Sequence, residues 1–91
     1  MPATALNTAQ ITEILCRYGA TRIVLFGGAL DSSQPLRAVD LAVAGIEGWA
    51  LFRAAAEVER ELNIPVDLVP LSPPTRFTRH IERKGRVLYG R

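Results

Sequence analysis

The sequence predicts a small α/β (α+β) domain in which helices flank a mixed β-sheet. Three observations predict this fold class. The 91 residues can form one hydrophobic core, so we expect a single domain over residues 1–91. Hydrophobic residues make up 48% of the chain and charged residues 22%, which is an ordinary globular composition. Helical and strand patterns alternate in the order helix, strand, strand, helix, strand, helix.

The chain should begin with an amphipathic helix followed by a buried strand. Apolar residues at helical spacing follow Thr8, a suitable N-cap, and end at Gly19, which suits a left-handed C-terminal cap. The run Ile23–Phe26 is wholly apolar, with branched and aromatic side chains, which is typical of a strand buried on both faces. This strand should end abruptly at Gly27 and Gly28.

A second strand and a second helix should fill the middle of the chain. Residues 31–35 have turn chemistry, and large apolar residues alternate with small or acidic ones over residues 38–43. An apolar stripe then predicts a helix over residues 49–62, with Asn63 as its C-terminal cap. The helix should pack against the sheet by that stripe.

The last third should add a strand and a helix. Residues 65–69 have the composition of a short strand, and Ser72, which precedes a proline, looks like a helix start. Phe77 and Ile81 should form the apolar side of this helix. Residues 87–89 form either a final strand or a docked tail.

Composition excludes several classes of protein. Cys16 is the chain's one cysteine, so it forms no internal disulfide and should be a packing residue in a reducing compartment. No apolar run reaches the roughly 20 residues of a membrane span, and the N-terminus lacks the layout of a signal peptide. We therefore expect a soluble cytoplasmic protein that does not enter a membrane.

Charge and aromatic residues leave two questions open. The net charge of +2 is too small to indicate nucleic-acid binding, although the basic residues gather late in the chain. They form either a solvated helix face or a surface for an anionic partner. His80, among them, should be solvated. Trp49 could stack on a base or a partner, but in so small a domain we expect it in the core.

Two aspartates in otherwise apolar strands require an explanation. Asp40 lies in the second expected strand and Asp67 in the third, and both strands should lie near the turn at Gly27 and Gly28. Charged residues are poor strand formers, and burying a carboxylate is costly. Either these residues are structural, capping turns or lying at sheet edges in contact with water, or they belong to a site.

Four strings favour a site: Leu25–Gly28, Val39–Val43, Val66–Val69 and Gly85–Gly90. Their order resembles the minimal nucleotidyltransferase domain of the DNA polymerase β superfamily. In that family a glycine and a serine follow the first strand, two aspartates one residue apart lie on the next, and a lone carboxylate lies on the third. The resemblance covers the chain from about residue 23 to its end and implies a nucleotidyltransferase-like fold.

The resemblance also implies roles for individual residues. Gly27 and Gly28 would bind the nucleotide, because a glycine turn lets the backbone approach a triphosphate. Asp40 and Asp67 would be metal ligands, with Asp67 also a residual catalytic residue that acts as base or ligand. The implied cofactors are ATP and Mg²⁺, which two carboxylates and substrate phosphates would hold only weakly.

The sequence departs from the family pattern at its catalytic positions. Ala38 stands where the first aspartate of the pair belongs, and Gly28 stands where the serine belongs. The basic residue that often follows the serine is also absent. Whether Asp31 replaces the missing carboxylate stays open, although we expect Asp31 in the turn rather than on the strand face where a ligand is needed. Two-metal alignment should therefore be lost while the fold, which needs none of these acids, persists.

The resemblance implies a prokaryotic protein-binding module, the antitoxin of a toxin–antitoxin pair whose toxin is a helical HEPN-domain protein. The alternative is an active Mg²⁺-dependent enzyme that transfers AMP from ATP to a protein or small hydroxyl acceptor. A homo-oligomer is a further option. We do not expect nucleic-acid binding, for which the late basic residues would be the surface.

Overall fold

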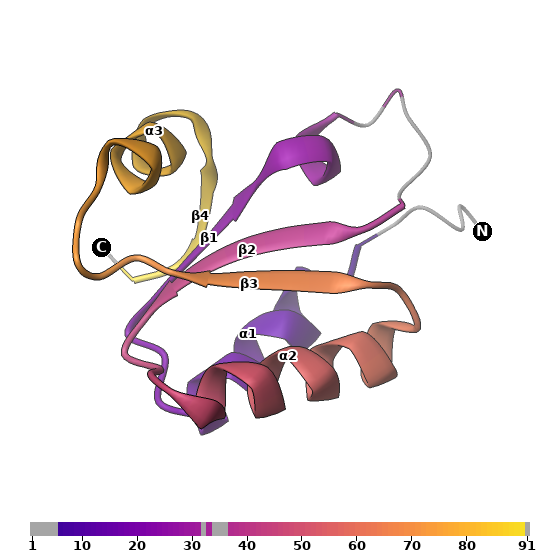
Figure 1. Ribbon diagram of the computed structural model, residues 1–91. Helices are drawn as coiled ribbons and strands as arrows, with labels where there is room; N and C mark the ends of the chain where they lie inside the picture. The colour runs from indigo at the N-terminus through magenta and orange to yellow at the C-terminus, as the bar shows by residue number, and fades with distance from the viewer. Residues whose placement is uncertain (1–5, 32, 34–36, 91) are drawn as a thin grey trace.

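A computed structural model describes residues 6–31, 33 and 37–90 of the chain (Figure 1). Its helices and strands follow the expected order, with one short 3₁₀ turn after the first strand. The elements are α1 (Thr8–Arg17), β1 (Arg22–Phe26), η1 (Gly27–Leu30), β2 (Val39–Ala44), α2 (Trp49–Leu62), β3 (Val66–Pro70), α3 (Arg76–Lys84) and β4 (Arg86–Tyr89). The turn expected over residues 31–35 lies mostly outside the described residues. None of the described helices combines the length and apolar character that a membrane crossing requires.

The described strands form one mixed sheet in the order β3-β2-β1-β4. β1 runs antiparallel to both β2 and β4, whereas β2 and β3 are parallel and are connected through α2. Of the two options for residues 87–89, the strand is confirmed, because they belong to β4. The predicted fold class is confirmed.

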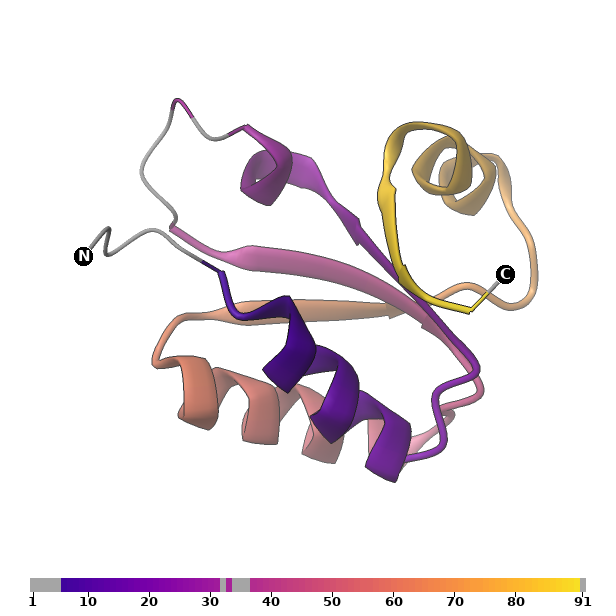
Figure 2. The ribbon, with the colours of Figure 1, turned by 180° about the vertical axis from the view of Figure 1, so that it is seen from behind.

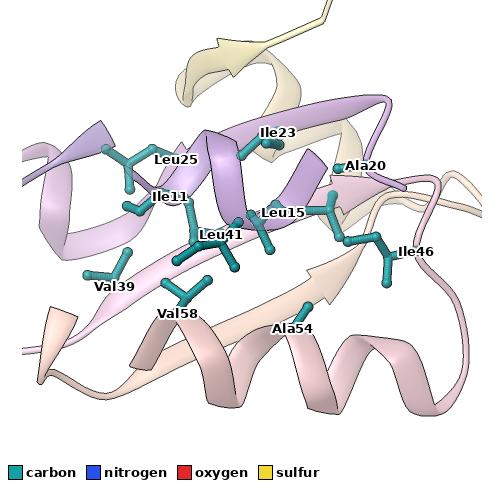
Figure 3. Close-up of a cluster of buried hydrophobic side chains, with 12 residues drawn as sticks. Ile11, Leu15, Ala20, Ile23, Leu25, Val39, Leu41, Ile46, Ala54 and Val58 are labelled. Carbon is teal, nitrogen blue, oxygen red and sulfur yellow. The ribbon is translucent and has the colours of Figure 1, made fainter. Parts of the chain in front are cut away.

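Helices cover both faces of this sheet, but unequally. α1 and α2 lie together under one face, and α3 lies on the opposite side beside β4 (Figures 1 and 2). The main core lies between the sheet and the α1–α2 layer (Figure 3). Its buried side chains are Ile11, Ile14, Leu15, Ala20, Ile23, Leu25, Val39, Leu41, Val43, Ile46, Ala54 and Val58.

A smaller apolar cluster lies on the other face, under α3. It consists of Val24, Ala42, Leu71 and Ile81. Because successive strand residues point to opposite faces, β1 is buried on both sides, as its continuous apolar run predicted, and so is the middle of β2, where an alternating pattern was expected. α3 covers part of this second face, and the aspartates of β2 and β3 lie on the remainder.

Two helices begin at other residues than expected, because neighbouring polar residues compete to cap the first N–H groups of the helix. The N-cap of α1 is Asn7, whose side chain accepts a hydrogen bond from the Gln10 N–H at 2.9 Å, so Thr8 is the first helical residue. At the other end, Gly19 has the expected positive φ, at 103°. Asn63 likewise ends α2 in the left-handed conformation, as predicted.

The last helix begins at Arg76, so the start expected at Ser72 is wrong. Thr75 is the N-cap, and it forms a capping box with Thr78: each side chain accepts a hydrogen bond from the other residue's N–H, at 3.1 and 2.7 Å. Reciprocal capping satisfies two N–H groups at once, which Ser72 does not offer. Thr78 also takes a buried position on this helix.

Two aromatic residues expected inside lie at the surface. Trp49 is 79% exposed, so its assignment to the core is wrong. Phe77 is 56% exposed, and of the two residues predicted to form the apolar side of α3 only Ile81 is buried. Helical phase explains Trp49, because α2 directs Val58 into the core and Trp49, on the opposite side, away from it. Phe77 lies at the margin of the contact between α3 and the sheet, where it meets Phe26 edge-on.

Candidate functional site

Asp40 and Asp67 lie side by side on the sheet. In the parallel register of β2 and β3 they are direct partners, and across the antiparallel pair Asp40 faces Phe26 of β1. Partner residues share a face, so both carboxylates lie on the face that α3 covers in part. Asp40 is half-buried and Asp67 exposed. The structure thus brings together the two acids that the sequence singled out.

The turn at Gly27 and Gly28 lies next to the carboxylate of Asp40. The chain leaves β1 at Phe26 and enters η1, where Gly27 has φ 75°. A Cβ at Gly27 would overlap the Asp40 carboxylate and lie 3.2 Å from its Cγ. Glycine is therefore needed at this position both for the conformation and for the close approach. A Cβ at Gly28, in contrast, meets no atom within 4 Å.

The surroundings of Asp40 disfavour its charged form. Burial raises the pKa of Asp40 above its ordinary value, and repulsion from the neighbouring Asp67 raises it further. A cation between them would relieve this cost. A carboxylate pair in register is thus the one feature of this face that suits a divalent ion.

The number of acids limits what metal the site could hold. Among the described residues, no three acidic, histidine or cysteine side chains gather closely enough to hold a metal ion. Asp31 bonds instead to Ser33, accepting from its N–H at 2.9 Å and from its hydroxyl at 2.5 Å, which lowers the pKa of Asp31. Asp40 and Asp67 fit a single Mg²⁺ that also takes phosphate oxygens, and they do not fit a two-metal cage.

Ala38 lies next to this pair, immediately before β2. Parallel pairing continues to that end of the strand, because the Val39 N–H donates to the Pro65 carbonyl at 2.9 Å. Residues two apart on an extended chain share a face, so position 38 is where a second β2 carboxylate would join Asp40. A methyl group there supplies no ligand.

Replacing Asp40 with asparagine should stabilise the protein at neutral pH. The raised pKa of Asp40 means that the fold disfavours its charged form. That cost is therefore absent below the aspartate pKa of the unfolded chain, about 3.9, and is fully present once the pH rises above the folded-state pKa. Thermal melts of Asp40→Asn and wild type should differ at pH 7, with the variant higher, and converge near pH 3. A lower melting temperature for Asp40→Asn at pH 7 would show that the carboxylate is a structural group.

Sequence reasoning missed two aromatic contacts. Phe77 of α3 meets Phe26 edge-on, with ring centroids 5.9 Å apart, next to the aspartate pair. On α2, Trp49 and Phe52 lie together at the surface with centroids 5.6 Å apart. A helical wheel centred on the apolar stripe of residues 49–62 places Trp49 on the side opposite the stripe, so the exposure of Trp49 could have been predicted from the sequence.

Comparisons with known proteins bear on the fold. No protein-family model matches the sequence, and no curated protein matches it. A solved toxin–antitoxin complex with AMP-PNP is 25% identical, with a TM-score of 0.81 over 94% of this chain and 75% of that chain. A complex of tri-AMPylated Shewanella oneidensis HEPN toxin with MNT antitoxin is 24% identical, with a TM-score of 0.74 over 97% and 73%. An MntA–HepT toxin–antitoxin complex is 23% identical, with a TM-score of 0.74 over 93% and 71%.

The sheet order, the glycine turn and the aspartate pair, together with these matches, define a nucleotidyltransferase fold. More narrowly, the chain has the fold of the minimal nucleotidyltransferase (MNT) antitoxins, the fold that the sequence strings implied. The match extends over nearly all of this chain and about three quarters of the solved ones.

Proposed function

We propose that this protein is a cytoplasmic MNT-type antitoxin that acts by binding a helical HEPN-type toxin and that has lost nucleotide transfer. The observation that carries the proposal is the close match in fold, over 94% of the chain, to toxin–antitoxin complexes. One of those solved structures holds tri-AMPylated Shewanella oneidensis HEPN toxin in complex with MNT antitoxin. A toxin of the same class is the simplest partner to propose for this chain.

The chemistry of the aspartate face supports the loss of catalysis. Nucleotidyl transfer requires carboxylates that hold and align two metal ions against a phosphate centre. Among the residues that the structure describes, Asp40 and Asp67 are the acids gathered at this place, with Ala38 in place of a third, and Gly28 offers no hydroxyl for a phosphate. Removing one catalytic carboxylate typically costs several powers of ten in rate, whereas the fold does not depend on it.

Co-expression tests the antitoxin role. The gene next to this one on its chromosome should encode a helical protein that arrests growth when expressed alone. We expect this chain to relieve the arrest and to purify with that protein as a complex. An Asp40→Asn/Asp67→Asn variant should relieve it equally if binding alone suffices. A stable wild-type monomer that neither binds the neighbour nor restores growth would refute the proposal.

A second candidate function is AMP transfer from ATP to a hydroxyl of the partner. The specific observation in its favour is that Asp40 and Asp67 are direct neighbours and that their repulsion would be relieved by a cation. A bound Mg²⁺ would neutralise charge on the phosphates. The two side chains would hold the ion, and the Gly27 turn would bring the backbone close to the nucleotide.

Labelled ATP separates the two functions. The protein, Mg²⁺ and the neighbour-encoded partner are incubated with ATP labelled in the adenine or α-phosphate. Binding without transfer predicts no label on the partner above that seen with Asp67→Ala. Labelling that depends on Mg²⁺ and disappears in Asp67→Ala would establish the enzyme and exclude a purely binding role.

A further inference from the structure

The outward side of α2 carries the most exposed aromatic side chains in the described part of the chain. Trp49 is 79% exposed and Phe52 is 69% exposed, and the two rings touch one another rather than the core. At about 100° per residue, these positions lie opposite Val58 and Ala54, which are fully buried. Tryptophan and phenylalanine at a surface are enriched where a partner protein packs.

On this outward side, opposite the buried stripe of α2, apolar residues continue along the helix from the two rings and end at a pocket. Ala56 follows Trp49 and Phe52 on the same side, because residues at spacings of three, four and seven share one helix face. Beyond it lies a pocket of about 370 Å³ at the C-terminal end of α2. The pocket is lined by Ala56, Glu59, Arg60, Asn63, Ile64 and Pro65. One helix face therefore offers protruding rings at one end and a recess at the other.

The charges on α2 differ between its flanks. Glu57 is paired with Arg17 at 3.0 Å, whereas Glu59 accepts from the Val66 N–H and Glu61 from Gln10, neutral donors that leave both carboxylates charged. Arg53 and Arg60 form no ion pair with any described residue. They lie seven residues apart, about 10 Å along the flank beside Trp49, while Glu59 lies on the opposite flank, beside Phe52. The flank with Arg53 and Arg60 therefore offers positive charge to a partner.

We propose that this surface, the α2 outer face (Trp49, Phe52, Arg53, Ala56 and Arg60), docks an amphipathic helix of a partner protein. The apolar seam of that helix packs on the two rings and Ala56, and one of its side chains enters the pocket beyond. Acidic residues two turns apart on its flank meet Arg53 and Arg60. The inference rests on the proposed function for the existence of a partner, and it adds where the partner binds and with what chemistry.

A helix of another protein fits this surface better than the same helix of a second copy. In a two-fold antiparallel pairing, equivalent flanks of the two helices face each other. The flanks that carry Arg53 and Arg60 would then lie together, which places four positive charges along one seam. An acidic flank on a helix of another protein, placed against Arg53 and Arg60, removes that repulsion.

Because Trp49 is the chain's one tryptophan, it reports directly on its own burial. The protein is prepared with 5-fluorotryptophan and mixed with the helical protein encoded by the neighbouring gene, unlabelled. We expect the fluorine resonance to move on complex formation and its H₂O/D₂O isotope shift to fall. In the free protein at the same concentration, the isotope shift should be that of an exposed indole.

Variants measure how much the surface contributes to affinity. Trp49→Ala/Phe52→Ala should weaken the complex at least about tenfold, because buried aromatic anchors carry much of an interface. Arg53→Glu/Arg60→Glu should weaken it by a similar factor and make the remaining affinity less sensitive to salt. Arg79→Glu/Arg83→Glu on α3 is the matched control, with the same charge change, and should alter the affinity less than about threefold. All six side chains are exposed or at a helix surface, so circular dichroism and melting temperature should stay near wild type.

The outcomes separate this inference from the function on which it rests. A complex that forms while the fluorine label stays exposed, or that tolerates both α2 variants, overturns the inference and leaves the antitoxin role standing. Equal weakening by the α3 control overturns it too, because charge alone would then explain the loss. A free protein whose label is already shielded in a concentration-dependent dimer identifies a second copy as the occupant and overturns it. With no complex at all, the proposed function and this inference fail together.

Discussion

The Ala38→Asp/Gly28→Ser protein should bind MgATP at least about tenfold more tightly than the wild type. Aspartate at position 38 would face the same side as Asp40, two residues away, and would complete a group of three carboxylates with Asp67. Serine at position 28 would add a hydroxyl to the backbone N–H groups of the glycine turn. Titration calorimetry with MgATP measures the gain directly, and the wild type provides the reference.

The structure has room for both changes. A Cβ at Gly28 meets no atom within 4 Å, so a serine side chain enters open space. Ala38 is half-buried and immediately precedes β2, where an aspartate can direct its charge to solvent or to a cation. We therefore expect the fold to survive and the Mg²⁺ dependence of binding to rise.

A third substitution provides the control. Adding Asp40→Asn to the double variant should remove the Mg²⁺-dependent part of the gain, because the new carboxylate needs its neighbour to hold the ion, while any gain from the serine hydroxyl remains. If the double variant folds but gains no MgATP affinity, position 38 does not face Asp40 and the alignment with the family pattern is wrong. If it gains affinity without Mg²⁺, the serine hydroxyl acts alone.

The sequence predicted the site's residues better than it predicted their arrangement. Composition and strand pattern suffice to place Asp40 and Asp67 on two strands near a glycine turn. That they are register partners depends on the parallel pairing of β2 and β3, which no local pattern encodes. The overlap of a Gly27 Cβ with the Asp40 carboxylate is likewise a tertiary contact. Local sequence patterns therefore identified the residues of the candidate site, whereas the sheet topology determines that these residues lie together.

Errors in the sequence reading came from choosing one local signal where two compete. Thr8 and Asn7 are both good caps, and the amide oxygen that reaches a free N–H decides between them. Ser72 and Thr75 compete in the same way, and reciprocal bonding with Thr78 decides. Trp49 was assigned by residue type rather than by helical phase. For an amphipathic helix whose core side is already filled, phase is the stronger guide.

Replacing Gly85 with alanine should cost about 3 kcal/mol of unfolding free energy, because the added methyl group has no room in the packed interior. Gly85 joins α3 to β4. Its added Cβ would lie 2.5 Å from Val24 Cγ1, 2.6 Å from the Ile81 carbonyl oxygen and 2.8 Å from the Leu25 carbonyl oxygen. Two of these three atoms are backbone, so no side-chain rotation relieves the overlap.

In a domain of this size such a loss should lower the melting temperature by more than about 10 °C. Gly28→Ala is the matched control: the same methyl group enters open space, so the change should stay within about 0.5 kcal/mol. Chemical denaturation of both variants and the wild type gives the comparison. Since α3 brings Phe77 to the edge of the aspartate face, Gly85→Ala should also loosen that contact. If Gly85→Ala is as stable as Gly28→Ala, α3 is not packed against β1 as closely as described, and the partial cover over Asp40 would have to be reconsidered.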